Sequence, residues 1–458
     1  MVPRPLSQSK KAKNLLEDPE GLCLYQLTVP MVIGIVAIMA FNLIDAFYIG
    51  MLGSKQLAAM AFTVPITGGV FALNLGFSSG TSAVLARIFG AGDRPLARRI
   101  ITHAIFLSIL VLGTISLIGL AYIEPIFRAM GASEEHLPYI QEYMSVWLMG
   151  AMVLVVPMVS NGALRASGDT KSPSFIMSVS ALINGILDPL LIFGIGPFPE
   201  LGMKGAALSS VFAWAFSCTA ALTILIRREN LIEFVMPTVT KLMDSWRRVL
   251  TIAMPAALNN LMAPIAMTVI ISLVAQFGEA AVAATGVGAR LEPMLMIVVM
   301  SMTASVGVMV GQNHGAGKLH RVRRIIHLSF RFALMWQVGV AILLVLFSSF
   351  LAKLFSDEQA VAEVLTRYLW IQPVSFGMLG VSMLSIAALN ALHQPMVAIL
   401  ISVLRLFGLM LPFAYLGATL YGVEGVYMGA ALANIIIGGF SYFLMMERLN
   451  KLETSGSG

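Results

Sequence analysis

Phe41-Asn42-Leu43-Ile44-Asp45-Ala46-Phe47 places a carboxylic acid in the middle of an apolar run that extends from Thr28 to Ile49. A run of this length can cross a bilayer as one α-helix, because about 20 apolar residues span the hydrocarbon core. A charged carboxylate at that depth is energetically unfavourable, so acids are rare in membrane-spanning helices and usually have a function there. The stretch therefore predicts a membrane-spanning helix with a functional acid, Asp45.

The composition of the whole chain agrees with a membrane protein. Of its 458 residues, 58% are hydrophobic and only 11% are charged, whereas about 25% of the residues of a soluble domain are charged. The formal net charge is +6, but the Lys and Arg residues lie in short segments between apolar runs, as membrane topology requires. We therefore predict a polytopic membrane protein and expect no nucleic-acid partner.

Twelve apolar runs predict an all-α fold with twelve transmembrane helices, each run being close to the ~20 residues that a span needs. The runs cover residues 28–49, 61–85, 101–123, 139–164, 174–196, 204–227, 251–277, 285–311, 326–350, 367–391, 398–421 and 424–446. The longest polar connection, 228–250, follows the sixth run. We therefore expect an N-terminal segment, 1–27, two lobes, 28–227 and 251–446, and a tail, 447–458, whose last residues are typical of a linker.

The basic residues of the connections predict the orientation of the chain. Twenty-one Lys and Arg residues lie in the N-terminal segment, in every second connection and in the C-terminal tail, whereas four lie in the opposite loops. Cytoplasmic loops are enriched in Lys and Arg, so we expect both termini in the cytoplasm and the protein in a bacterial cytoplasmic membrane. The N-terminal segment contributes Arg4, Lys10, Lys11 and Lys13.

The two halves of the chain are sequence repeats. A shift of 225 residues takes Gly90-Ala91-Gly92 to Gly315-Ala316-Gly317, and a shift of 224 takes Gly205-Ala206-Ala207-Leu208 to Gly429-Ala430-Ala431-Leu432. Each half has an even number of spans, so both halves enter the membrane from the same side. We therefore predict two parallel six-helix repeats, related by a pseudo-two-fold axis along the membrane normal, with a cavity between them.

The acids do not follow the repeat. Asp45 corresponds to Ile270, and Asp188 corresponds to Leu411. The apolar framework is thus duplicated while the acids are present in one copy. This asymmetry indicates that the chemistry belongs to the N-terminal half.

Asp45, Asp188 and Asn184 are the candidate cation-coupling residues. Asn184 and Asp188 are four residues apart and share one helix face, and Pro189 cannot donate a hydrogen bond to the carbonyl of Gly185. A structural salt bridge has no evident partner, because no basic residue lies in the interior of an N-half span. A buried carboxyl group can take up or release a proton, while the three side chains could also hold Na⁺. Both coupling ions stay open, and we expect no other cofactor.

Further polar residues lie within the predicted spans. Tyr143 and Asn161, on the fourth run, could hydrogen-bond to the acids, although Tyr143 could equally be an interfacial aromatic residue. Arg290 and Glu292 are two residues apart and would not face each other on a regular helix. Arg405 is close enough to the inner end of its run to extend to the membrane surface. We interpret these three charged residues as structural.

Four short motifs follow or lie within the predicted spans. They are Phe89-Gly90-Ala91-Gly92-Asp93, Ala163-Leu164-Arg165-Ala166-Ser167-Gly168-Asp169-Thr170, Asn184-Gly185-Ile186-Leu187-Asp188-Pro189 and Gly315-Ala316-Gly317. Together with the six-plus-six repeat, they resemble the multidrug and toxic compound extrusion (MATE) family over nearly the whole chain. Within that family the chain is similar to the branch named for a DNA-damage-inducible protein, in which acids of the N-terminal lobe carry the coupling.

The resemblance implies coupling roles for Asp45, Asn184 and Asp188, and hydrogen-bonding roles for the tyrosine and the asparagine of the fourth run. The other main bacterial branch uses an acid in the seventh span. There this chain has Leu261-Met262-Ala263-Pro264, without a carboxylate. The departure favours coupling in the N-terminal lobe.

We therefore predict a cation-coupled efflux antiporter, not an enzyme, with H⁺ favoured over Na⁺. It would export amphipathic, often cationic small molecules by alternating access, as a monomer surrounded by lipid. The alternative is a flippase for lipid-linked precursors, but anionic head groups would require Arg or Lys residues that the N-terminal lobe lacks. An intramembrane enzyme would need a polar cluster at membrane depth, yet the histidines all lie at or near loops or span ends: His103, His136, His314, His320, His327 and His393.

Overall fold

The structure is a computed structural model that describes residues 14–235 and 238–455; within these ranges it consists of helices and short connections, with no strand. Arg4, Lys10, Lys11 and Lys13 of the predicted N-terminal segment, and the last three residues of the tail, lie outside the described part. The helices of the first half are α1 Glu20–Leu52, α2 Ser54–Gly90, α3 Arg94–Ala121, α4 Ile123–Ala129, α5 Leu137–Ala166, α6 Lys171–Phe193, α7 Gly202–Thr223 and the π-helix η1 Ile224–Arg228. Those of the second half are α8 Val239–Val274, the 3₁₀-helix η2 Ala275–Phe277, α9 Glu279–Leu295, α10 Ile297–Gly315, α11 Leu319–Phe355, α12 Gln359–Ala391, α13 Pro395–Val403, the π-helix η3 Leu404–Met410 and α14 Leu411–Ser455.

The predicted twelve spans are confirmed within the described residues. Ten helical stretches are individually long and apolar enough to cross a membrane, and α9 with α10 forms one more span that is bent by 44°. The last of the ten stretches, Pro395–Thr454, contains two spans, because the backbone leaves the helical conformation at Tyr421 and Gly422. Gly422 has a φ of +63°, which favours glycine over residues with a Cβ atom. The helical segments before and after Gly422 fold back on each other, so that Gly417 packs against Gly425.

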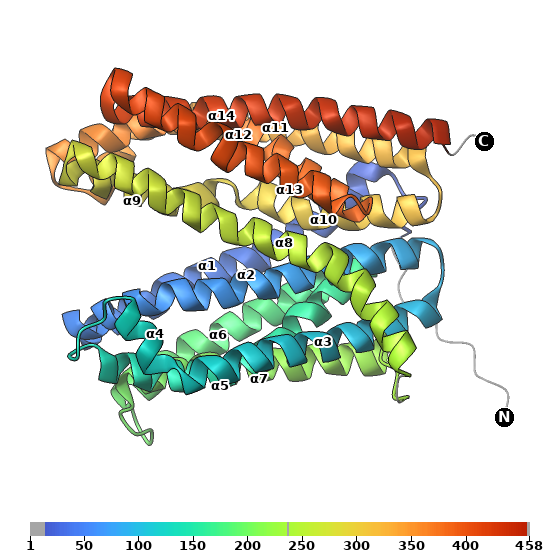
Figure 1. Cartoon of the computed structure of the whole chain (residues 1–458), viewed down its shortest axis with the longest axis horizontal. Helices are drawn as coiled ribbons and strands as arrows, with labels where there is room; N and C mark the ends of the chain where they lie inside the picture. The colour runs from blue at the N-terminus through green and yellow to red at the C-terminus, as the bar shows by residue number, and fades with distance from the viewer. Residues whose placement is uncertain (1–13, 236–237, 456–458) are drawn as a thin grey trace.

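Two groups of helices form the two lobes of the molecule. In Figure 1, α1 to α7 gather in one half of the picture and α9 to α14 in the other, with α8 between them. The first lobe has a continuous core that includes Phe77, Ile100 and Ile140, and the second has separate cores that include Phe376 and Leu365. The two repeats thus have largely separate cores, except that α8, the first span of the second repeat, contributes Val249, Ile252 and Ala253 to the core of the first lobe.

The lobes touch through a pair of glycines that the repeat relates to each other. A Cβ atom added at Gly90, the end of α2, would lie 2.0 Å from the carbonyl oxygen of Gln312 in α10. A Cβ atom added at Gly315, the end of α10, would lie 2.1 Å from the carbonyl oxygen of Arg87 in α2. Since no side chain fits between them, the two helices meet backbone to backbone at this end of the molecule.

Helix α1 belongs to both lobes. Leu24 and Leu27, near its start, are buried in the core of the second lobe, and Thr28 Oγ1 donates a hydrogen bond to Ser305 Oγ of α10 at 3.0 Å. Two residues later, the carbonyl of Pro30 accepts a hydrogen bond from Ser174 Oγ of α6. The helix therefore passes from the second lobe to the first around a proline, which cannot donate a helical hydrogen bond.

Large apolar side chains cover the outside of the second lobe. On α11, Met335, Leu346 and Phe350 are 73%, 71% and 67% exposed, and Val338 and Ile342 between them are also exposed. Their spacing of three or four residues places them on one helix face. An apolar stripe of this length is unusual on a soluble protein, and it is the surface expected to face lipid.

We predict that Gly90→Ala destabilises the contact between the lobes. The added methyl group would overlap the Gln312 backbone, and overpacking of this kind costs about 1–3 kcal/mol. The variant should unfold at a lower temperature than the wild type in a thermal unfolding assay in detergent. The control is Gly113→Ala in α3, where an added Cβ atom has no neighbour within 4 Å. Equal unfolding temperatures for the two variants would contradict the proposed contact.

Candidate functional site

Asp188 is held by two side chains, one from its own helix and one from the neighbouring helix α7. Asn184, one turn before it on α6, donates from Nδ2 to Asp188 Oδ1 at 3.1 Å and to Ser209 Oγ of α7 at 2.8 Å. Ser209 Oγ also hydrogen-bonds to Asp188 Oδ1. Asn184, Asp188 and Ser209 are 3%, 0% and 0% exposed. The predicted pair of Asn184 and Asp188 is thus part of a buried triad.

The Ser209 hydroxyl can serve this triad in two arrangements. Its oxygen lies within hydrogen-bond distance of Asp188 Oδ1 and 2.8 Å from the carbonyl oxygen of Ala206, but a hydroxyl group has only one hydrogen. When Asp188 is ionised, the hydroxyl can donate to the carboxylate. When Asp188 is protonated, the acid can donate to Ser209, which then donates to Ala206. Both states of the acid therefore find hydrogen-bond partners.

Asp45 comes close to this triad from α1. Its carboxylate interacts electrostatically with that of Asp188, so the two acids that the sequence places at matching depths also lie near each other. Asp45 is half-buried, and its Oδ1 atom is buried without a hydrogen-bond partner among the described residues. Neither acid has a neighbouring Lys, Arg or His among the groups that act on it. The structural alternative, a salt bridge, therefore has no support in the described part of the chain.

The two other predicted residues differ in their placement. Tyr143 of α5 is 4% exposed and interacts electrostatically with both Asp45 and Asp188, so it points into the lobe and is not an interfacial aromatic residue. Asn161, further along α5, has a buried Oδ1 atom without a hydrogen-bond partner in the ranges that the structure describes. Asn161 forms no hydrogen bond with either acid there, and it is not among the groups that act electrostatically on them. The structure thus brings four of the five predicted residues together.

The site offers oxygen atoms for a proton or a hard cation. Two carboxylates, the Asn184 amide and the Ser209 hydroxyl are all oxygen donors, which suit Na⁺ better than a transition metal. No group of three or more His, Cys, Asp or Glu side chains that could hold a metal ion occurs in the described residues. The proposed Na⁺ ligands Asp188, Asn184 and Asp45 remain a prediction, with Ser209 as an additional donor.

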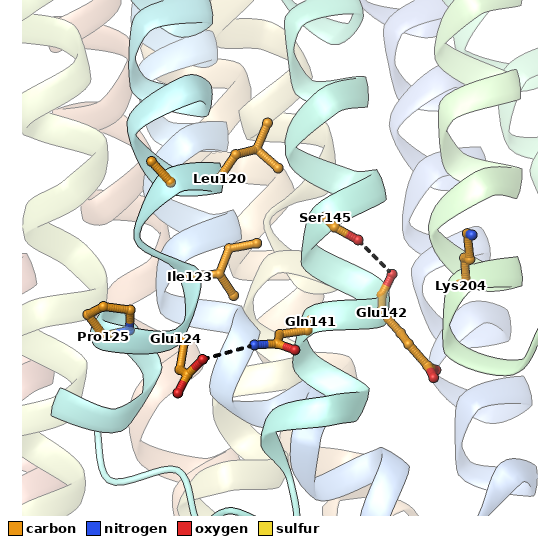
Figure 2. A pocket seen from close by; sticks show the side chains of 9 residues that line it. Leu120, Ile123, Glu124, Pro125, Gln141, Glu142, Ser145 and Lys204 are labelled. Atoms are coloured by element: carbon orange, nitrogen blue, oxygen red, sulfur yellow. Dashed lines mark hydrogen bonds between the residues drawn. The ribbon is translucent and has the colours of Figure 1, made fainter.

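A cavity of about 600 Å³ lies elsewhere on the first lobe, between α4, α5 and α7. It is lined by Leu120, Ala121, Ile123, Glu124, Pro125, Gln141, Glu142, Ser145 and Lys204. Figure 2 shows Gln141 directed at Glu124, with a hydrogen bond of 3.5 Å between them. None of the predicted site residues lines this cavity, and it lies at the lobe end opposite to the contact between α2 and α10.

Ser209 is the site residue that the sequence reasoning missed. The repeat that relates Gly205-Ala206-Ala207-Leu208 to Gly429-Ala430-Ala431-Leu432 ends at the next position, where Ser209 corresponds to Ala433. The same asymmetry that singled out Asp45 and Asp188 would therefore have identified Ser209. Serine is common in transmembrane helices, however, so the signal is weak without the contact to Asp188.

Known proteins resemble the chain over most of its length. A family model described as MatE matches residues 30–190 and 255–416. A protein of Shewanella oneidensis named "FAD transporter" is 40% identical over 435 residues, which are 95% of this chain and 96% of that protein. The "Probable multidrug resistance protein YoeA" of Bacillus subtilis is 24% identical over 455 residues, 97% of each chain. The crystal structure of the Vibrio cholerae MATE transporter VcmN in the bent form superposes with a TM-score of 0.90 and 32% identity, covering 95% of this chain and 98% of that chain.

We predict that Ser209→Ala lowers the free energy of unfolding by about 1–3 kcal/mol, because it removes one of the two hydrogen bonds that Asp188 Oδ1 and Asn184 Nδ2 each form in the buried triad. Thermal or denaturant unfolding in detergent measures the change. Thr219→Ala is the control on the same helix: this residue is exposed, and its hydroxyl bonds only the backbone carbonyl of Ala215. A Ser209→Ala variant as stable as Thr219→Ala would show that the triad does not stabilise the lobe.

Proposed function

The chain belongs to the multidrug and toxic compound extrusion family of multi-pass membrane transporters, and from this premise we propose that it exports small organic molecules in exchange for protons at Asp45 and Asp188. The observation that carries the proposal is the pair of interacting acids in the first lobe, without a basic partner in the described residues. An acid that is not neutralised by a salt bridge is free to change its charge. Such a change is what coupling to a cation gradient requires.

The triad supports protons as the coupling ion. Ser209 can exchange its donor bond between Asp188 and the Ala206 carbonyl, so Asp188 Oδ1 keeps a hydrogen-bond partner whether or not the acid is protonated. A Na⁺ ion would instead need about six oxygen ligands directed at it, as hard cations do. The triad and Asp45 carry six side-chain oxygen atoms, but Asn184 directs its Nδ2 atom, not its oxygen, at Asp188 and Ser209. Protons are therefore the favoured coupling ion, and Na⁺ is the alternative.

The contact between the lobes supports an outward-facing arrangement. The contact at Gly90 and Gly315 lies beside the described terminal segments, because Lys318 Nζ donates to the carbonyl of Leu16 and Arg323 pairs with Glu453. We place both termini in the cytoplasm. The cytoplasmic side is then the closed side. In this state the acids would receive protons from outside, and the loss of repulsion between Asp45 and Asp188 would let α1 approach α6. This movement would narrow the first lobe and displace the substrate outward.

Two substrate classes are candidates within the same function. Amphipathic organic cations are the expectation from the sequence, and they agree with two acids that can attract a positive charge. Flavin adenine dinucleotide is the second candidate, because the relative named as its transporter is 40% identical over 95% of this chain. A flippase is less consistent with the first lobe, because no Lys or Arg lies in the middle of its described long helices. Arg165, at the end of α5, donates to Ser78 Oγ at 2.8 Å near the closed end.

We predict that Asp45→Asn and Asp188→Asn each abolish proton-coupled export, because an amide cannot carry the proton. Purified protein in liposomes would be tested for transport of ethidium, driven separately by a pH gradient and by a Na⁺ gradient. The wild type should respond to the pH gradient, and both variants should fall to the level of protein-free liposomes. Asp357→Asn, in the exposed loop between α11 and α12, is the control and should transport as the wild type does.

Two outcomes of this assay would contradict the proposal. If the Asp45→Asn variant retained pH-driven export, the acids of the first lobe would not couple transport. If the Na⁺ gradient alone drove the wild type, the coupling ion would be Na⁺.

A further inference from the structure

The second lobe has charged side chains inside its spans that the proposed function does not use. Arg290 and Glu292 lie on α9, and Arg405 lies in η3. The repeat-related helix of the first lobe, α2, has Lys55 and Arg87 near its two ends and no charged residue between them. The lobes therefore differ in charge at membrane depth: acids in the first lobe, and both arginines and a glutamate in the second.

Arg405 has a guanidinium group without a bonded partner. It lies ten residues after the start of α13, which is about 15 Å along the helix at ~1.5 Å per residue. Its side chain is half-buried, and it forms no hydrogen bond or ion pair with any described residue. The surrounding segment, Leu404–Met410, is π-helical, a conformation that is rare and frequent at functional sites. An arginine of this kind in a membrane-spanning helix indicates a ligand.

Glu292 is the charged neighbour of Arg405, but the two do not form an ion pair. Their charges interact electrostatically, so both side chains point into the same part of the lobe. Glu292 lies thirteen residues after the start of α9, directly before Pro293 and close to the bend between α9 and α10. Because the two charges are near each other yet not bonded, a molecule between them could satisfy both.

A buried aromatic pair fixes the position of Glu292. The rings of Tyr368 and Tyr427 meet edge to face with centroids 5.0 Å apart, and Tyr427 Oη lies 2.7 Å from Thr285 Oγ1 of α9. One turn before Glu292, an added Cβ atom at Gly288 would lie 2.6 Å from the Tyr368 ring. The start of α9 is therefore held rigidly against α12 and α14. A rigidly held helix fixes the position of its side chains, so α9 can hold Glu292 in the geometry that binding requires.

We propose that Arg405 and Glu292 form a second ligand site, in the second lobe, for an organic molecule that carries a phosphate group and a hydrogen-bond donor. Arg405 binds the phosphate through its planar fork of N–H groups, and Glu292 accepts from the donor. The site deepens the proposed export function, on which it rests, because it selects anionic substrates while the acids of the first lobe carry the protons. Flavin nucleotides have both groups, and organic cations have neither a phosphate nor another anion for Arg405.

The test compares flavin mononucleotide with riboflavin, two probes that differ only in one phosphate. Binding to the full-length protein in dodecyl maltoside is measured by the quenching of flavin fluorescence. The wild type should bind flavin mononucleotide at least about tenfold more tightly than riboflavin, as charge-assisted hydrogen bonds predict. Arg405→Gln should remove this preference and leave riboflavin binding unchanged. Arg405→Lys, which keeps the charge but not the fork, should retain part of the preference.

Arg331→Gln is the matched control. Arg331 lies in α11 of the same lobe, and its side chain is exposed, so the same charge is removed outside the proposed site. This variant should keep the preference of the wild type. Equal binding of the two flavins to the wild type, no binding of either, or an unchanged preference in Arg405→Gln and Arg405→Lys would overturn the proposal. Failure of the export function would appear instead in the liposome transport assay with Asp45→Asn, which does not involve Arg405.

Discussion

The burial of a carboxyl group, Asp188, is the constraint on which the site depends. A polar group removed from water must find its hydrogen bonds within the protein. Asp188 Oδ1 finds them in Asn184 and Ser209, while Asp188 Oδ2 has no partner among the described residues. The triad joins α6 to α7, and the second acid, Asp45, reaches it from α1. The three neighbours of Asp188 thus lie on α6, α7 and α1. A change in the charge of Asp188 therefore affects the packing of these three helices.

In the two repeats, the residues that pack the helices are duplicated, whereas the polar residues of the sites are not. The repeat preserves the residues that let helices touch, as the pair Gly90 and Gly315 shows, and it leaves the polar residues free to differ. Each lobe can then carry its own charge: acids near α1 in the first lobe, and Arg405 with Glu292 in the second. A binding site in one lobe and a proton site in the other would couple through the helix that belongs to both, α1.

Much of the fold could be predicted because lipid imposes length and polarity on each span. The twelve runs, the repeat and the matched depth of Asp45 and Asp188 all follow from local sequence. The attachment of α1 to the second lobe could not be predicted, because the Thr28–Ser305 hydrogen bond joins residues far apart in the chain and has no trace in the repeat. Nor could local sequence choose Ser209 among many helical serines, or show that Asn161 forms no hydrogen bond with the acids. These features depend on the tertiary packing of the helices, which local sequence does not determine.

Proton release on substrate binding tests the central claim most directly. If substrate and protons compete at Asp45 and Asp188, adding ethidium to the detergent-solubilised protein in weakly buffered solution should release protons, which a pH indicator dye detects. The account predicts release from the wild type and none from Asp45→Asn with Asp188→Asn combined. Ethidium binding without proton release from the wild type, or equal release from the double variant, would contradict it.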